Sequence, residues 1–158
     1  MRWLALAIVA VTGCSSTADV GGDYAVRVTD ESDGCNRATR DQFDTRMAID
    51  QADSSANVTF PVDSDYGNLF LLPIFGTDGF DVTVDGSAIS AMVLGTEPTM
   101  RDGCTFYSQL VLAAKVDGDK ITGTMGFTPT TIAGPGCTPP DPPSCTTRQS
   151  LSATRLAM

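Results

Sequence analysis

The chain has 158 residues, of which 42% are hydrophobic, and a formal net charge of −9. Its length is enough for a single domain with a sizeable core. All but two of its 19 acidic residues are aspartate, which favours turns, and the negative charge argues against nucleic acid and anionic lipid headgroups as partners. The absence of histidine excludes a Ser-His-Asp triad, a Cys-His pair and histidine-ligated zinc or copper.

The N-terminus has the parts of an export signal, in order. A short cationic start, Met1-Arg2, is followed by an apolar run over residues 3–11 and small residues before Cys14. The run is too short to cross a bilayer, which takes about 20 residues. The last four residues, Val11-Thr12-Gly13-Cys14, resemble the lipobox of bacterial lipoproteins. The resemblance implies that residues 1–13 are removed and that Cys14 carries lipid, which would anchor the protein in the bacterial cell envelope, facing the periplasm or the cell exterior.

Residues 14–22 are small, polar and rich in glycine, so we expect a flexible tether between the lipid and the domain. A single domain then occupies residues 23–158. One alternative for the N-terminus is a plain secreted form cleaved near Ala18, and another is a buried N-terminal strand in which Cys14 is incidental.

Four cysteines remain in the body of the chain, and an even number in an exported domain predicts two disulfides with three possible connectivities. We favour a Cys137–Cys145 bridge, because these residues frame a short loop rich in proline, and a Cys35–Cys104 bridge. No C-x-x-C spacing is present, so a metal site is not expected.

In the N-terminal half, a period of two over residues 24–29 predicts a half-buried strand. Residues 36–46 are polar and fit a loop or a single helical turn. Residues 47–51 and 58–62 resemble a hairpin. The most apolar run, Leu69–Phe75, has no polar face. We expect a core strand with a bulge at its proline; the alternatives are the wall or lip of a ligand cavity and an edge that binds a partner.

In the C-terminal half, residues 80–84 alternate and lead into Asp85-Gly86, which predicts a two-residue type I′ hairpin with a strand over residues 87–94. A long strand over 104–116 returns through Asp117-Gly118-Asp119 to a strand over 121–127. Residues 149–156 supply the last strand.

These segments predict an all-β domain, an antiparallel meander of about eight strands closed as a barrel, with a β-sandwich as the alternative. The succession of strands from Phe80 to Phe127, each joined to the next by a tight turn, resembles the calycin (lipocalin-like) meander. The inward-facing residues expected to be buried together are Phe80, Val82, Val84, Ile89, Ala91, Leu110, Leu112, Ile121 and Phe127.

Candidate catalytic groups are few. Asp50, Asp81 and Asp85 are expected on outer faces, no Gly-x-Ser-x-Gly elbow exists, and the pattern at Asp63 and Asp65 resembles the start of a calcium loop but lacks its glutamate. We therefore expect neither a catalytic residue, nor a metal, nor a cofactor.

The aromatic side chains Tyr24, Phe106 and Tyr107 offer a surface for stacking a ligand, but Tyr24 and Phe106 fall on the inward register and are expected in the core. The sequence thus predicts a lipid-anchored, non-catalytic envelope protein that binds a small apolar ligand or acts structurally. The alternative is a carboxylate-dependent hydrolase acting on envelope glycans.

Overall fold

The computed structural model describes residues 16–34, 41–101, 104–133 and 145–157. Two short helical segments, η1 (Gly67–Leu71) and α1 (Leu72–Phe75), interrupt a single sheet. Its strands are β1 (Gly22–Asp33), β2 (Gln42–Ala52), β3 (Ser55–Thr59), β4 (Gly79–Asp85), β5 (Ala88–Leu94), β6 (Thr99–Arg101), β7 (Cys104–Asp117), β8 (Lys120–Ala133) and β9 (Thr147–Arg155).

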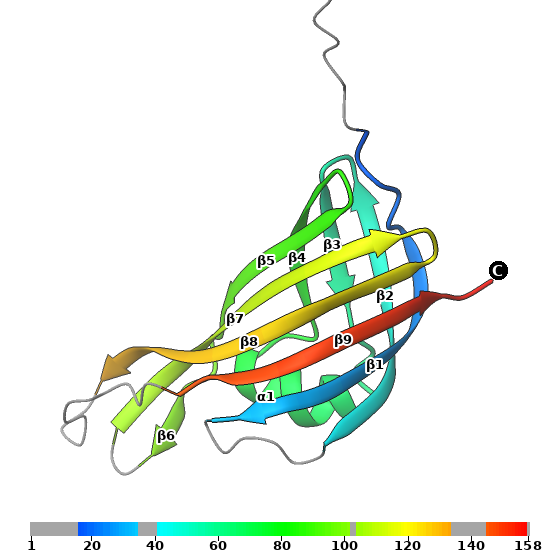
Figure 1. The fold of residues 1–158 in the computed structure, drawn as a ribbon. Coiled ribbons are helices and arrows are strands. Elements are labelled where there is room, and N and C mark those ends of the chain that lie inside the picture. The colour runs from blue at the N-terminus through cyan, green and yellow to red at the C-terminus, as the bar shows by residue number, and fades with distance from the viewer. Residues whose placement is uncertain (1–15, 35–40, 102–103, 134–144, 158) are drawn as a thin grey trace, which may run out of the picture.

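The sheet closes into an eight-stranded antiparallel barrel, which confirms the predicted fold (Figure 1). Strands β1 to β5 pair in chain order, β5 pairs with β7, β7 with β8 and β8 with β9, and β9 returns to β1. Strand β6 lies outside the closed ring and pairs only with the start of β7. Closure leaves the eight barrel strands with a partner on each side, which removes the edges of an open sheet.

The period of two in the sequence sets which residues fill the barrel. Along β7, every second side chain from Cys104 to Ala114 is buried, and β4 and β9 show the same alternation. Eight of the nine residues predicted to share the core are buried, and the ninth, Ala91, is partly buried against it. The faces were therefore assigned in the correct register.

The hairpin turn between β4 and β5 lies one residue later in the chain than predicted. Asp85 pairs with Ala88, so the turn residues are Gly86 and Ser87 rather than Asp85-Gly86. Only Gly86 has a positive φ, of 55°, which matches the type II′ pattern instead of type I′. Glycine at the first central position suits this turn because it adopts a positive φ at no steric cost.

The segment predicted to be a core strand over Leu69–Phe75 is helical, so that prediction is wrong. Pro73 is the second residue of α1, which follows η1 without a break. Gly76 then ends the helix in the left-handed conformation at a φ of 70°. An apolar run without a polar face is ambiguous between strand and buried helix, and here it packs inside the end of the barrel; its buried residues are Phe70, Leu71 and Phe75.

Part of the segment expected to be a flexible tether, residues 14–22, is docked on the barrel. The N–H of Ala18 donates to the carbonyl of Gly86 at 2.8 Å, and the side chain of Gln51 bonds both the N–H of Val20 and the carbonyl of Ala18. Val20 is completely buried. Any free tether is therefore confined to residues before Ala18.

Candidate functional site

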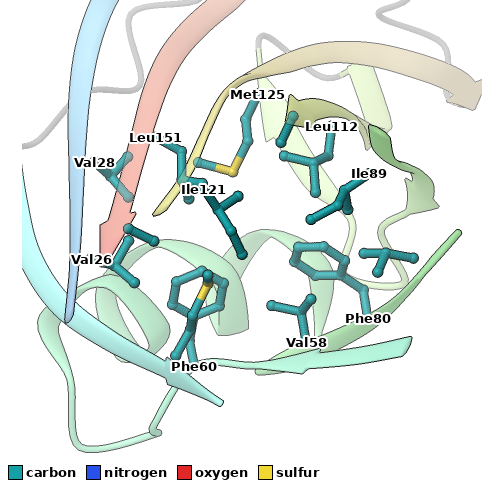
Figure 2. Close-up of a cluster of buried hydrophobic side chains, with 14 of the residues drawn as sticks. Val26, Val28, Val58, Phe60, Phe80, Ile89, Leu112, Ile121, Met125 and Leu151 are labelled. Atoms are coloured by element: carbon teal, nitrogen blue, oxygen red, sulfur yellow. The ribbon is translucent and has the colours of Figure 1, made fainter. Parts of the chain in front are cut away.

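The interior of the β-barrel is the place where a small apolar ligand would bind. It is filled by side chains from the surrounding strands, as Figure 2 shows for residues such as Val58, Phe80 and Leu112. A cavity of about 20 Å³ remains, and its lining is entirely apolar: Met47, Ile49, Val58, Phe60, Phe80, Ile89, Leu112, Ala114, Ile121, Met125 and Leu151. A space of this size admits about one water molecule, but the lining offers no polar partner that would hold it there.

The end of the barrel beside η1 and α1 is closed by aromatic rings. Tyr66 stacks on Phe70 with ring centroids 5.3 Å apart, and Phe70 meets Phe127 edge-on at 4.9 Å. Phe43 and Phe75 complete the group. Such offset and edge-to-face pairs add to the gain from burial alone.

At the opposite end, the N-terminal segment is docked against the barrel. The hydroxyl of Tyr24 donates to the carbonyl of Val20 at 2.9 Å, and Arg155 donates to the carbonyl of Asp19 at 2.6 Å. Val20 and Tyr24 are completely buried, so the docked segment covers part of this end of the barrel.

A chain of hydrogen bonds between polar side chains crosses the end of the barrel at which the aromatic rings gather. Tyr66 donates to the amide oxygen of Gln149 at 2.9 Å, and the amide nitrogen of Gln149 donates to a carboxylate oxygen of Asp30 at 2.6 Å. Both Tyr66 and Gln149 are fully buried. Burial, with a contribution from the Asp30 charge, raises the pKa of Tyr66 well above its usual value, so this side chain stays a neutral donor.

Asp30 is a second titratable group whose pKa this environment raises. Desolvation raises its pKa, the hydrogen bond from Gln149 opposes the shift, and the neighbouring charges of Asp33 and Asp41 raise it further. Its second carboxylate oxygen is buried and has no hydrogen-bond partner among the described residues.

We expect Asp30→Asn to stabilise the protein at pH 7. A raised folded-state pKa means that the folded protein holds this proton more tightly than the unfolded chain, so its stability falls as pH rises through the folded pKa. Asparagine keeps an oxygen for Gln149 and removes the buried charge. Urea denaturation of both proteins at pH values from 7 down to the ordinary aspartate pKa of 3.8 should show an advantage that shrinks as pH falls. A variant that is less stable at pH 7 would contradict this assignment.

The candidate carboxylates predicted from the sequence lie outside the barrel interior. Asp50, Asp81 and Asp85 are exposed, as expected, and Asp81 accepts a hydrogen bond from Asn57 across the strand pair. Asp63 and Asp65 lie in the segment that leads into η1. Within the described residues, no group of three or more acidic or cysteine side chains is arranged to hold a metal ion.

The aromatic residues considered for stacking behave as predicted. Tyr24 and Phe106 are buried, and Tyr107 is half-buried. Among the expected bridging cysteines, Cys104 and Cys145 are described, whereas Cys35 and Cys137, like the predicted lipid site Cys14, lie outside the described residues.

Sequence reasoning missed the polar chain from Tyr66 to Asp30. A signal was present, because Gln149 falls on the inward register of the last predicted strand, between Thr147 and Leu151. A polar side chain at such a position needs a buried partner. The sequence could not indicate that the partner lies in a helical turn 83 residues away.

No family model and no curated protein sequence matches this chain. The resemblance to calycins thus remains one of strand pattern. Over the part of the chain described here, helices are too short or too polar to reach across a membrane.

Proposed function

We propose that this protein is a lipid-anchored, non-catalytic β-barrel module of the bacterial cell envelope that acts through its outer surface, in a structural or interaction role. The observation that supports this proposal is the packed interior, which leaves a cavity of about 20 Å³. An engineered apolar cavity that binds benzene measures about 150 Å³, so even a small apolar ligand would need the core to rearrange.

The hydrolase alternative has less support in the geometry. A glycosidase needs two carboxylates flanking an open cleft. Asp50, Asp81 and Asp85 point outward from the barrel wall, where carboxylates ordinarily meet solvent.

The proposed lipid anchor at Cys14 can be tested by substitution. Cys14→Ser should yield a protein that is either soluble and lipid-free or left with its signal uncut, because the acyl chains that hold it, at about 0.8 kcal/mol per buried CH₂, would be lost. Membrane fractionation and mass spectrometry of the mature N-terminus measure both outcomes. Ser16→Ala, which leaves the lipobox intact, serves as the matched control. Tight membrane association of the Cys14→Ser protein, with the signal removed, would place the anchor elsewhere.

The disulfide pairing remains a prediction, and the strand register now favours a different connectivity. Asp33 pairs with Thr147, and the N–H of Gly34 donates to the carbonyl of Thr146 at 3.2 Å. Because the next residues along these two segments are Cys35 and Cys145, we expect peptide mapping without reduction to recover them joined. Recovery of a Cys137–Cys145 peptide would restore the pairing favoured from the sequence.

A further inference from the structure

The charge of this protein is distributed unevenly around the barrel. Strands β5, β7, β8 and β9 are consecutive in the barrel, and their only acidic residue is Asp117, at the end of β7. The same strands carry the exposed basic residues Lys115, Lys120 and Arg148, of which Lys120 lies across from Asp117 and directly follows Asp119 in the β7–β8 turn. The opposite wall is strongly acidic; the acidic residues of β1 to β4 are Asp23, Asp30, Glu31, Asp33, Asp44, Asp50, Asp81 and Asp85.

The outward-facing residues of β5, β7, β8 and β9, which we call the neutral wall, also include exposed apolar side chains. Met92 is 71% exposed, Leu94 56% and Val111 43%, and Met92 lies directly across the strand pair from Val111. Most of the other outward positions on β8 and β9 are threonine or serine. Figure 1 shows β7, β8 and β9 running side by side across this wall.

We propose that the neutral wall lies against the bilayer and meets anionic phospholipid headgroups, an inference that rests on the lipid anchor proposed above. Three cationic side chains stand here against Asp117 and, in the β7–β8 turn, Asp119, so this wall lacks the large excess of carboxylates on β1 to β4 and is the face that an anionic surface repels least. The exposed methionine, leucine and valine suit the boundary between headgroups and acyl chains. Charges on the acidic wall act weakly across the barrel, because the Debye length is about 10 Å at 0.1 M salt.

The docked N-terminus supports this orientation. Ala18 bonds to Gly86 in the turn that leads into β5, the first strand of the neutral wall. Ala18 is the fourth residue after Cys14, which sets a maximum reach of about 14 Å between them. A barrel held this close to the headgroups must turn some part of its surface towards them, and the acidic wall would be repelled.

Two matched tryptophan variants test the orientation, because the chain's only tryptophan, Trp3, leaves with the predicted signal. Ala113 on the neutral wall and Ala48 on β2 are both exposed alanines on outer faces. The lipidated Ala113→Trp and Ala48→Trp proteins are reconstituted into vesicles of phosphatidylcholine and phosphatidylglycerol with brominated acyl chains. We expect quenching of Ala113→Trp to exceed that of Ala48→Trp by about twofold or more.

Each other outcome has a distinct meaning. Protein that does not float with the vesicles overturns both the lipid anchor and the orientation. Protein that floats with equal quenching at both positions, or with stronger quenching at Ala48→Trp, overturns the orientation alone. A third outcome is that the emission of Ala113→Trp shifts to the blue as protein concentration rises in detergent, without selective quenching in vesicles. This result would show that the neutral wall binds a second copy of the chain, and it would overturn the proposal that the wall lies against the bilayer.

A charge variant separates electrostatics from simple proximity. Lys115→Gln combined with Arg148→Gln should bring the ratio of quenching at the two positions close to one in these vesicles. Arg46→Gln, which removes an exposed cation from the acidic wall, should leave the ratio unchanged. If the ratio survives the loss of Lys115 and Arg148, headgroup attraction does not set the orientation.

Discussion

Replacing Phe127 with alanine should lower the free energy of unfolding by about 3–5 kcal/mol. The ring is 1% exposed and lies within 4.9 Å, centroid to centroid, of Phe70 and 5.8 Å of Phe75. The strand that carries it is paired on both sides, so the backbone cannot move inward to fill the space. Urea denaturation monitored by far-UV circular dichroism measures the change.

The control for this substitution is Asp81→Asn on the outer face of β4. The carboxylate of Asp81 is exposed and accepts one hydrogen bond from Asn57. The side-chain oxygen of an asparagine at position 81 can accept the same bond, so the free energy of unfolding should change by no more than about 0.5 kcal/mol. A larger loss for Asp81→Asn than for Phe127→Ala would contradict the assignment of faces.

Gly123→Ala should be the second costly substitution, at about 1–3 kcal/mol. A Cβ built at Gly123 would lie 2.4 Å from the Cβ of Ala114 and 2.5 Å from the carbonyl oxygen of Ala113. Those atoms belong to the main chain of β7 or are fixed to it, so β7 and β8 would have to separate. Thermal and urea denaturation should both report the loss.

Gly126→Ala, three residues along β8, is the matched control. Its Cβ would meet nothing within 4 Å, and alanine restricts the unfolded chain more than glycine does. We expect this variant to be as stable as the parent or more stable by about 0.5–1 kcal/mol. Equal losses at Gly123 and Gly126 would show that the strand needs glycine for its backbone and not for close approach.

The barrel was predictable from sequence because its strands alternate cleanly. In β4, Phe80, Val82 and Val84 alternate with exposed polar residues, and this period of two fixes both the strand and its inner face. Turn chemistry located the reversals to within a residue, since glycine marks a positive φ but does not say which central position it takes.

The helical segment over η1 and α1 and the hydrogen bonds from Tyr66 to Asp30 could not be predicted from local sequence patterns. Leu69–Phe75 has no polar face, and only the packing of Phe70 on Phe127 decides that it lies as a helix inside the barrel end. Likewise, the position of Gln149 indicates a buried polar side chain but does not identify the residue that it bonds. Net charge likewise does not show how carboxylates are distributed: of the 19 acidic residues, β5, β7, β8 and β9 carry only Asp117.

The pairing of β1 with β9 has a consequence for how the chain reaches its native state. Tyr24 lies opposite Arg155, so the first strand finds its second neighbour only when the final strand is available. Contacts this distant in sequence make folding slow, on the scale of milliseconds to seconds for domains of this class. A chain that stops before residue 147 lacks β9 and leaves β1 and β8 each with a bare edge. Such a fragment should associate with other chains through those edges instead of persisting as a smaller barrel.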